Sequence, residues 1–418
     1  MTLTARTDRR LVRAGVHSTR HVLVELTAPT RPVADERTPL NVAFILDRSG
    51  SMGGQKIALA RQAVERAVGA LDHRDRFSVV VYDDAIDVVV ESTTASGEAK
   101  RNALRRLARV EARGSTNLAE GWLRGAEQVA LHQSDDAINR CLLLTDGLAN
   151  VGDTDPETLA RHAAELRARG VVTSTFGVGA DFDERLLGAL ADAGGGHFYF
   201  IEQAVQIPDF ITSELGELLA VVARDATLEV QLAPGFRLAP LSTLATEQRE
   251  GGCRLALGDL VSGQDVEVVL SLEFPRGELG QTVSVFFTLS DREGALRGEG
   301  GCSVTWTYGD HAANDAQPRD REVDRAVARL YAARAEDEAL RLNAAGRFDD
   351  ARRALAGVAE RIRGYADRDE ELNELAARLG ADQAAYAAPM APMEMKARYF
   401  ASANTAHSRD ASGRARRR

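Results

Sequence analysis

Hydroxyl and carboxylate side chains are concentrated in the segment Asp47-Arg48-Ser49-Gly50-Ser51. The apolar run 41–46 before it has the length and composition of a buried strand, so the segment is expected at the carboxyl end of that strand. It offers one carboxylate and two hydroxyls within five residues. These are hard oxygen ligands, which Mg²⁺ prefers in proteins. The segment is therefore a candidate magnesium site.

Two further segments place similar groups at comparable positions. Asp146 directly follows the apolar run 141–145, and Thr116 lies in a loop, 112–117, that opens an amphipathic helical stretch. In an open parallel sheet, ligands bind beyond the carboxyl ends of the strands. The three loops are therefore expected at one edge of a sheet.

Each of these residues also has a simpler explanation. Ser49 and Ser51 are typical caps of a helix that follows Gly53, and Thr116 is a typical cap of the next helical stretch. Asp146 before Gly147 is a common turn residue. The occurrence of all three loops in one order along the chain favours the metal site.

The segments AFILDRSGSM, RGSTNLAEG and LLLTDGLAN resemble the three signature loops of von Willebrand factor type A (VWA) domains. The resemblance covers about 39–222. It implies a metal-ion-dependent adhesion site, with Mg²⁺ (or Mn²⁺ or Ca²⁺) held by Asp47, Ser49, Ser51, Thr116 and Asp146. More loosely, the whole chain resembles bacterial VWA proteins often labelled Ca-activated chloride channel homologues.

The resemblance implies a protein-interaction module and not an enzyme, with a partner protein that supplies an Asp or Glu to the metal. The alternative is a metal-dependent hydrolase. A hydrolase needs a general base or a second metal beside the ion. The signature loops offer no free His or Glu close to the ligands, which favours the interaction module.

The hydrophobic pattern predicts an α/β domain at 39–222, because apolar strands alternate with amphipathic helices, as in a doubly wound, mainly parallel sheet. The segment 223–308 is predicted as an antiparallel β-sandwich, since its strands are separated by turns and lack a helical period. Strand signals in 1–38 are predicted to belong to the same β-domain, into which the α/β domain is inserted.

A helical domain is predicted at 318–386 from three amphipathic stripes. The remaining segment, 387–418, is rich in Ala, Pro, Met and Ser and ends in a basic cluster, so we predict a disordered tail. Two other sets of polar residues are not expected to join a site. His197 is predicted to start a strand, and Asp83-Asp84 to solvate the end of one.

Composition excludes several classes of function. The chain has 418 residues and a formal net charge of −10, which argues against nucleic-acid binding. No lysine follows a glycine, so no P-loop is present. No apolar run is long enough to span a membrane, and no secretory signal is recognisable. Three widely spaced cysteines favour free thiols in a reducing compartment, so a cytoplasmic location is expected.

Overall fold

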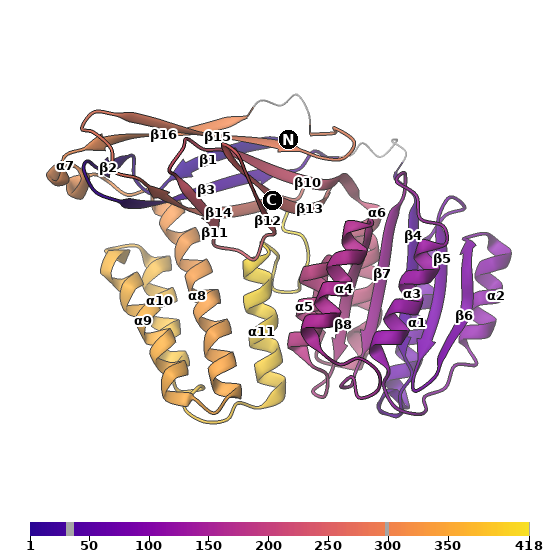
Figure 1. Cartoon of the computed structure of the whole chain (residues 1–418). Coiled ribbons are helices and arrows are strands. Elements are labelled where there is room, and N and C mark those ends of the chain that lie inside the picture. The colour runs from indigo at the N-terminus through magenta and orange to yellow at the C-terminus, as the bar shows by residue number, and fades with distance from the viewer. Residues whose placement is uncertain (31–36, 297–300, 418) are drawn as a thin grey trace. The chain divides into compact units, whose positions relative to one another are not determined.

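The computed structural model describes residues 1–30, 37–296 and 301–417 (Figure 1). The chain divides into two units. The first unit comprises Glu36–Ala220 together with Ala391–Phe400. The second comprises Met1–Asp35, Val221–Met390 and Ala401–Arg418.

A six-stranded sheet forms the centre of the first unit, in the order β6-β5-β4-β7-β8-β9. Every neighbouring pair is parallel except β5 and β6. The strands are β4 (Leu40–Asp47), β5 (Arg76–Tyr82), β6 (Ile86–Thr94), β7 (Ile138–Thr145), β8 (Val171–Val178) and β9 (Gly195–Ile201). All residues of β4 and β7 are buried, so both faces of the sheet are covered.

Six α-helices belong to the same stretch of the first unit: α1 (Gln55–Ala70), α2 (Gly97–Leu107), α3 (Leu118–Ala130), α4 (Pro156–Ala168), α5 (Glu184–Gly194) and α6 (Ile207–Leu219). Short 3₁₀ turns, η1 (Gly50–Met52) and η2 (Ala204–Gln206), precede α1 and α6. Helix α1 packs along α6, and α4 packs along α5. Strand–helix alternation around a mainly parallel sheet confirms the predicted doubly wound fold.

Two sheets form the β-sandwich of the second unit, in the orders β1-β3-β14-β11 and β12-β13-β10-β15-β16-β2. The N-terminal strands are β1 (Thr2–Thr7), β2 (Leu11–Arg13) and β3 (Ser18–Thr27). The later strands are β10 (Val221–Gln231), β11 (Arg237–Pro240), β12 (Thr246–Arg249), β13 (Gly252–Val261), β14 (Asp265–Phe274), β15 (Thr282–Ser290) and β16 (Cys302–Gly309). Strand β3 pairs with β14 over its full length, so the N-terminal strands complete a sandwich made from the later segment. The apolar core between the sheets includes Trp306, Phe274 and Phe287.

The second unit continues with α7 (His311–Ala316) and with three longer helices, α8 (Arg321–Ala344), α9 (Phe348–Ala366) and α10 (Glu370–Asp382). Helix α9 packs against both α8 and α10. The apolar face of α8, with Val323 and Leu330, also packs on Leu23 of β3 and Val269 of β14. The helices therefore share a core with the sandwich.

The predicted disordered tail is wrong over most of its length. Helix α11 spans Pro392–Ala406, and the part of it up to Phe400 belongs to the α/β unit. Beyond α11, the Ser408 hydroxyl accepts a hydrogen bond from the Glu267 amide at 3.0 Å, and the Asp265 amide donates to the Arg416 carbonyl at 2.9 Å. The tail is thus ordered, with Ala391–Phe400 part of the α/β unit and the residues that follow part of the second unit.

Parts of some predicted segments lie outside the described residues, namely 31–36, 297–300 and 418. The three cysteines are free thiols, two of them buried. Among the described residues, none of the helices is both long and apolar enough to cross a membrane.

Candidate functional site

The three loops singled out in the sequence meet at the carboxyl edge of the α/β sheet. Asp47 is the last residue of β4, Asp146 follows the last residue of β7, and Thr116 lies two residues before α3. The Ser51 hydroxyl donates to Asp146 Oδ1 at 2.6 Å and lies 3.1 Å from the Ser49 hydroxyl. A β-carbon built on Gly147 would lie 3.5 Å from both Ser51 Oγ and Thr116 Oγ1. The structure therefore brings all three loops into one cluster.

Asp47 is fully buried at the base of this cluster. Its Oδ2 accepts a hydrogen bond from the Thr145 hydroxyl at 2.6 Å, and its Oδ1 accepts one from the Ser49 amide at 2.7 Å. Burial raises the pKa of Asp47 to about 6, although these hydrogen bonds oppose the rise. A cation beside a buried carboxylate stabilises its ionised form, which burial alone disfavours.

The simpler explanation, that these hydroxyls cap helices, does not fit the structure. The N-cap of α1 is Gly54, and the N-cap of α3 is Asn117, whose side chain accepts from the Glu120 amide. Ser49 precedes η1 but makes no side-chain cap. The serine and threonine hydroxyls therefore face a cluster of oxygens, a donor set that suits a hard divalent cation such as Mg²⁺.

Asp83 was expected to solvate a strand end, but it is 1% exposed and joins two of the loops. Its carboxylate accepts from Arg48 at 3.1 Å and from Arg113 at 2.7 Å. Although burial opposes the change, the hydrogen bonds from Arg113 and Arg48 lower the pKa of Asp83 below its ordinary value. A backbone hydrogen bond also joins the loops that carry these two arginines: the Arg113 amide donates to the Arg48 carbonyl at 2.7 Å. Asp83 thus positions the loops without belonging to the oxygen cluster.

Lys56, in the first turn of α1, is a second residue at this site that was not expected from the sequence. Its ammonium donates to Asp146 Oδ2, while Asp146 Oδ1 accepts from Ser51. Asp146 is fully buried, whereas Lys56 is partly exposed. The lysine therefore supplies a positive charge beside Asp146.

If the oxygen cluster holds Mg²⁺, removing the charge of Lys56 should tighten the binding of that ion. In Lys56→Met the aliphatic stem is kept, and we expect an affinity about threefold to tenfold higher, since a unit charge a few ångströms from the ion is lost. Isothermal titration calorimetry at low ionic strength measures the change. Lys100→Met is the control, because Lys100 donates to the carbonyls of Gly69 and Leu71 and not to the cluster. Equal tightening in both variants would show a general charge effect.

Mg²⁺ binding should also depend on pH. Because the pKa of Asp47 is about 6 in the metal-free fold, protons compete with the cation below that pH. We expect a constant affinity above pH 7 and a fall of about tenfold per pH unit below pH 6. The stability of the metal-free domain should change in the opposite direction. Because the pKa of Asp47 is raised in the fold, Asp47 stabilises the fold at low pH, and this stabilisation is lost as pH rises from about 4 to 6. Calorimetric titrations from pH 5 to pH 8 and thermal unfolding from pH 4 to pH 8 test the two trends, and a flat affinity profile would contradict the first.

Comparisons with known proteins show the family to which the α/β domain belongs. The family model for the von Willebrand factor type A domain matches residues 41–213. The uncharacterized protein YfbK of Escherichia coli K12 is 27% identical over 257 residues, which cover 60% of this chain and 44% of YfbK. The uncharacterized protein sll0103 of Synechocystis is 29% identical over 261 residues, covering 60% of each chain. The chain thus spans about half the length of these two relatives.

A solved structure extends the likeness beyond the matched residues. A von Willebrand factor type A protein from Catenulispora acidiphila superposes with a TM-score of 0.70 at 20% identity, covering 91% of this chain and 87% of the other. At this identity the likeness concerns the fold alone. Residues 41–213 of this chain are a von Willebrand factor type A domain, a fold that commonly serves as a protein-interaction module.

Proposed function

We propose that this protein is a Mg²⁺-dependent interaction module that binds a carboxylate of a partner protein. The cation would be held by the carboxylates of Asp47 and Asp146 and the hydroxyls of Ser49, Ser51 and Thr116. The observation that supports the proposal is the meeting of the three loops that carry these side chains, with the Ser51 hydroxyl donating to Asp146 Oδ1 at 2.6 Å and lying 3.1 Å from the Ser49 hydroxyl. Mn²⁺ or Ca²⁺ fits the same oxygen donors, with Ca²⁺ needing more ligands.

The charge of the cluster supports recognition of an acidic group. Two carboxylates belong to it, and Asp146 is already paired with Lys56. A divalent ion bound here is therefore incompletely neutralised, and its role is to attract an anionic ligand. Ser51 is exposed while Asp47 is buried, so a partner approaches over the serine loop. An Asp or Glu of a protein partner is the matching ligand.

The partner can be identified by affinity capture with the full-length chain. We expect the partner to bind in Mg²⁺, to be released by EDTA, and to return when excess Mg²⁺ is restored. Asp47→Ala should capture none of it under any of these conditions. Hydrolysis of phosphoester or peptide substrates by the wild type with Mg²⁺ or Mn²⁺, absent in Asp47→Ala, would contradict the proposal and establish an enzyme instead.

A further inference from the structure

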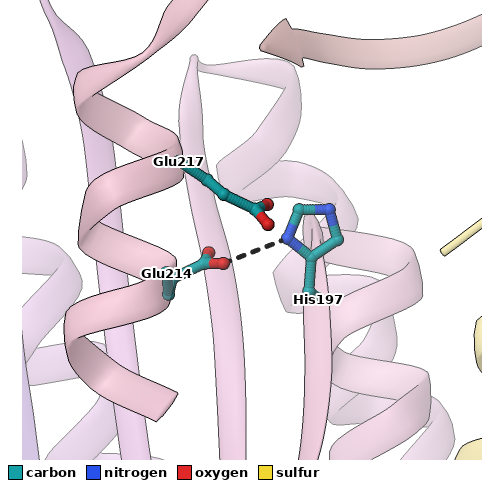
Figure 2. Close-up of side chains that lie close together, drawn as sticks. All are labelled: His197, Glu214 and Glu217. Carbon is teal, nitrogen blue, oxygen red and sulfur yellow. Dashed lines mark hydrogen bonds and ion pairs between the residues drawn. The ribbon is translucent and has the colours of Figure 1, made fainter. Parts of the chain in front are cut away.

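A second group of possible metal ligands lies elsewhere in the α/β unit. His197 of β9 and Glu214 and Glu217 of α6 point toward one another (Figure 2). One ligand atom from each side chain can be chosen so that all three lie within 4.8 Å of one another. The sequence predicted only a strand-start role for His197, because the glutamates that meet it come from a later helix.

Hydrogen bonds from neighbouring side chains orient the Glu214 carboxylate in the absence of an ion. It is 1% exposed, and its Oε1 accepts from the Ser174 hydroxyl at 2.6 Å. Its Oε2 accepts from the Tyr199 hydroxyl at 2.6 Å. The Ser174 hydroxyl also accepts from the His197 amide at 3.2 Å, which ties the two sides of the group together. Such outer hydrogen bonds orient ligating carboxylates in metal sites.

The remaining geometry also fits a metal ion. His197 Nδ1 lies 3.3 Å from Glu214 Oε2. Two ligands at about 2.0–2.1 Å from a tetrahedral ion are separated by about 3.3–3.4 Å, so this pair already has the required spacing. Glu217 lies three residues after Glu214, on the same face of α6, and is 9% exposed. The His197 side chain is 31% exposed, which gives an ion a path from solvent.

We propose that His197, Glu214 and Glu217 form a second cation site, selective for a transition-metal ion of the Zn²⁺ type. An imidazole nitrogen favours Zn²⁺ over Mg²⁺ and Ca²⁺, which prefer oxygen ligands alone. The cation would also compensate two carboxylates that are largely withdrawn from water. Three protein ligands leave one tetrahedral position for water.

This site is separate from the oxygen cluster and does not depend on its function. His197 lies on β9, which is three strands along the sheet from β4, where Asp47 is the last residue, so the two sites are built from different strands. A bound ion would link α6 to β9. Glu217 lies four residues before Val221, where β10 of the other unit begins, so the ion would fix the last turn of the helix that leads into that unit.

Zn²⁺ affinity of the full-length protein tests the site. Competition with a chromophoric chelator, in excess Mg²⁺ to occupy oxygen-only sites, is expected to show one tight Zn²⁺ per chain. We expect the Zn²⁺ affinity to fall by about 100-fold in His197→Ala and by about 10-fold to 100-fold in Glu217→Gln. Asp47→Ala and His132→Ala, which alters an exposed histidine, should keep the wild-type affinity.

Circular dichroism without added metal checks that each variant folds. Glu217→Gln keeps the shape of its side chain and is therefore the variant least expected to disturb the fold. X-ray absorption at the zinc edge should show nitrogen and oxygen neighbours without sulfur, which separates this site from binding at cysteine. No tight Zn²⁺ in the wild type, or an affinity unchanged in both His197→Ala and Glu217→Gln, would overturn the proposal. The group would then be a hydrogen-bonded contact between α6 and β9.

Discussion

Asp47→Ala is expected to weaken Mg²⁺ binding by about 100-fold or more, because it removes one of the two carboxylates of the proposed site. The domain should still fold. The Thr145 hydroxyl and the Ser49 amide lose an acceptor, but a buried carboxylate whose pKa is raised to about 6 is removed as well. These two changes in the free energy of unfolding oppose one another. Calorimetric titration of the full-length protein measures the loss of binding.

Two variants serve as comparisons. Asp47→Asn keeps the shape of the side chain and should lose Mg²⁺ as Asp47→Ala does, since charge and not volume decides binding. Asp136→Ala removes an exposed acid that lies before β7, at the other end of the strand from Asp146, and should bind Mg²⁺ like the wild type. Undiminished binding in both Asp47 variants would show that the ion is held elsewhere.

Lys396→Ala is expected to destabilise the α/β unit by about 3–5 kcal/mol, the cost of leaving a buried charge without its partner. Lys396 of α11 donates to Glu184 Oε2 of α5 at 2.7 Å, and the two residues are 5% and 9% exposed. The ammonium also lies 4.7 Å from the centre of the Phe182 ring. Faster hydrogen exchange of the α5 amides, measured by mass spectrometry, reports the loss within this unit.

A double-mutant cycle separates the ion pair from the rest of the helix. Glu184→Ala together with Lys396→Ala should cost less than the sum of the single changes, because neither charge is then buried alone. Glu394→Ala is the matched control on α11. It breaks only an exposed pair with Arg398 and should cost about 0.5 kcal/mol or less. Equal effects of Lys396→Ala and Glu394→Ala would contradict the buried contact.

The oxygen cluster could be predicted because its chemistry is local in sequence. Each loop directly follows an apolar strand or opens a helix, so strand order and parallel direction bring the loops together. The α/β fold could be predicted because apolar strands alternate with amphipathic helices along the sequence. The residues that tune the cluster were not predictable in this way. Asp83 meets Arg48 and Arg113 across 35 and 30 positions, and Lys56 meets Asp146 across 90.

The ordered C-terminal segment was not predictable for a related reason. Its composition lacks an apolar stripe, which argues for disorder when the segment is considered alone. Its order comes from particular contacts with a unit far away in sequence. Tyr399 packs against Gly188, where a β-carbon would lie 2.1 Å from the tyrosine hydroxyl oxygen, and Arg185 stacks over the Tyr399 ring at 4.5 Å. Phe400 meets Phe198 edge to face at 6.0 Å.

The affinity of the captured partner, measured in Mg²⁺ and in EDTA for the wild type and for Thr116→Ala, tests the proposed function most directly. We expect tight binding only for the wild type in Mg²⁺. Thr116→Ala should lower the affinity for the partner. In the absence of the partner it should bind Mg²⁺ more tightly than Asp47→Ala does, because it loses a neutral ligand and not a charged one. A partner affinity that is the same in Mg²⁺ and in EDTA, and the same in Thr116→Ala, would contradict the metal-dependent mechanism.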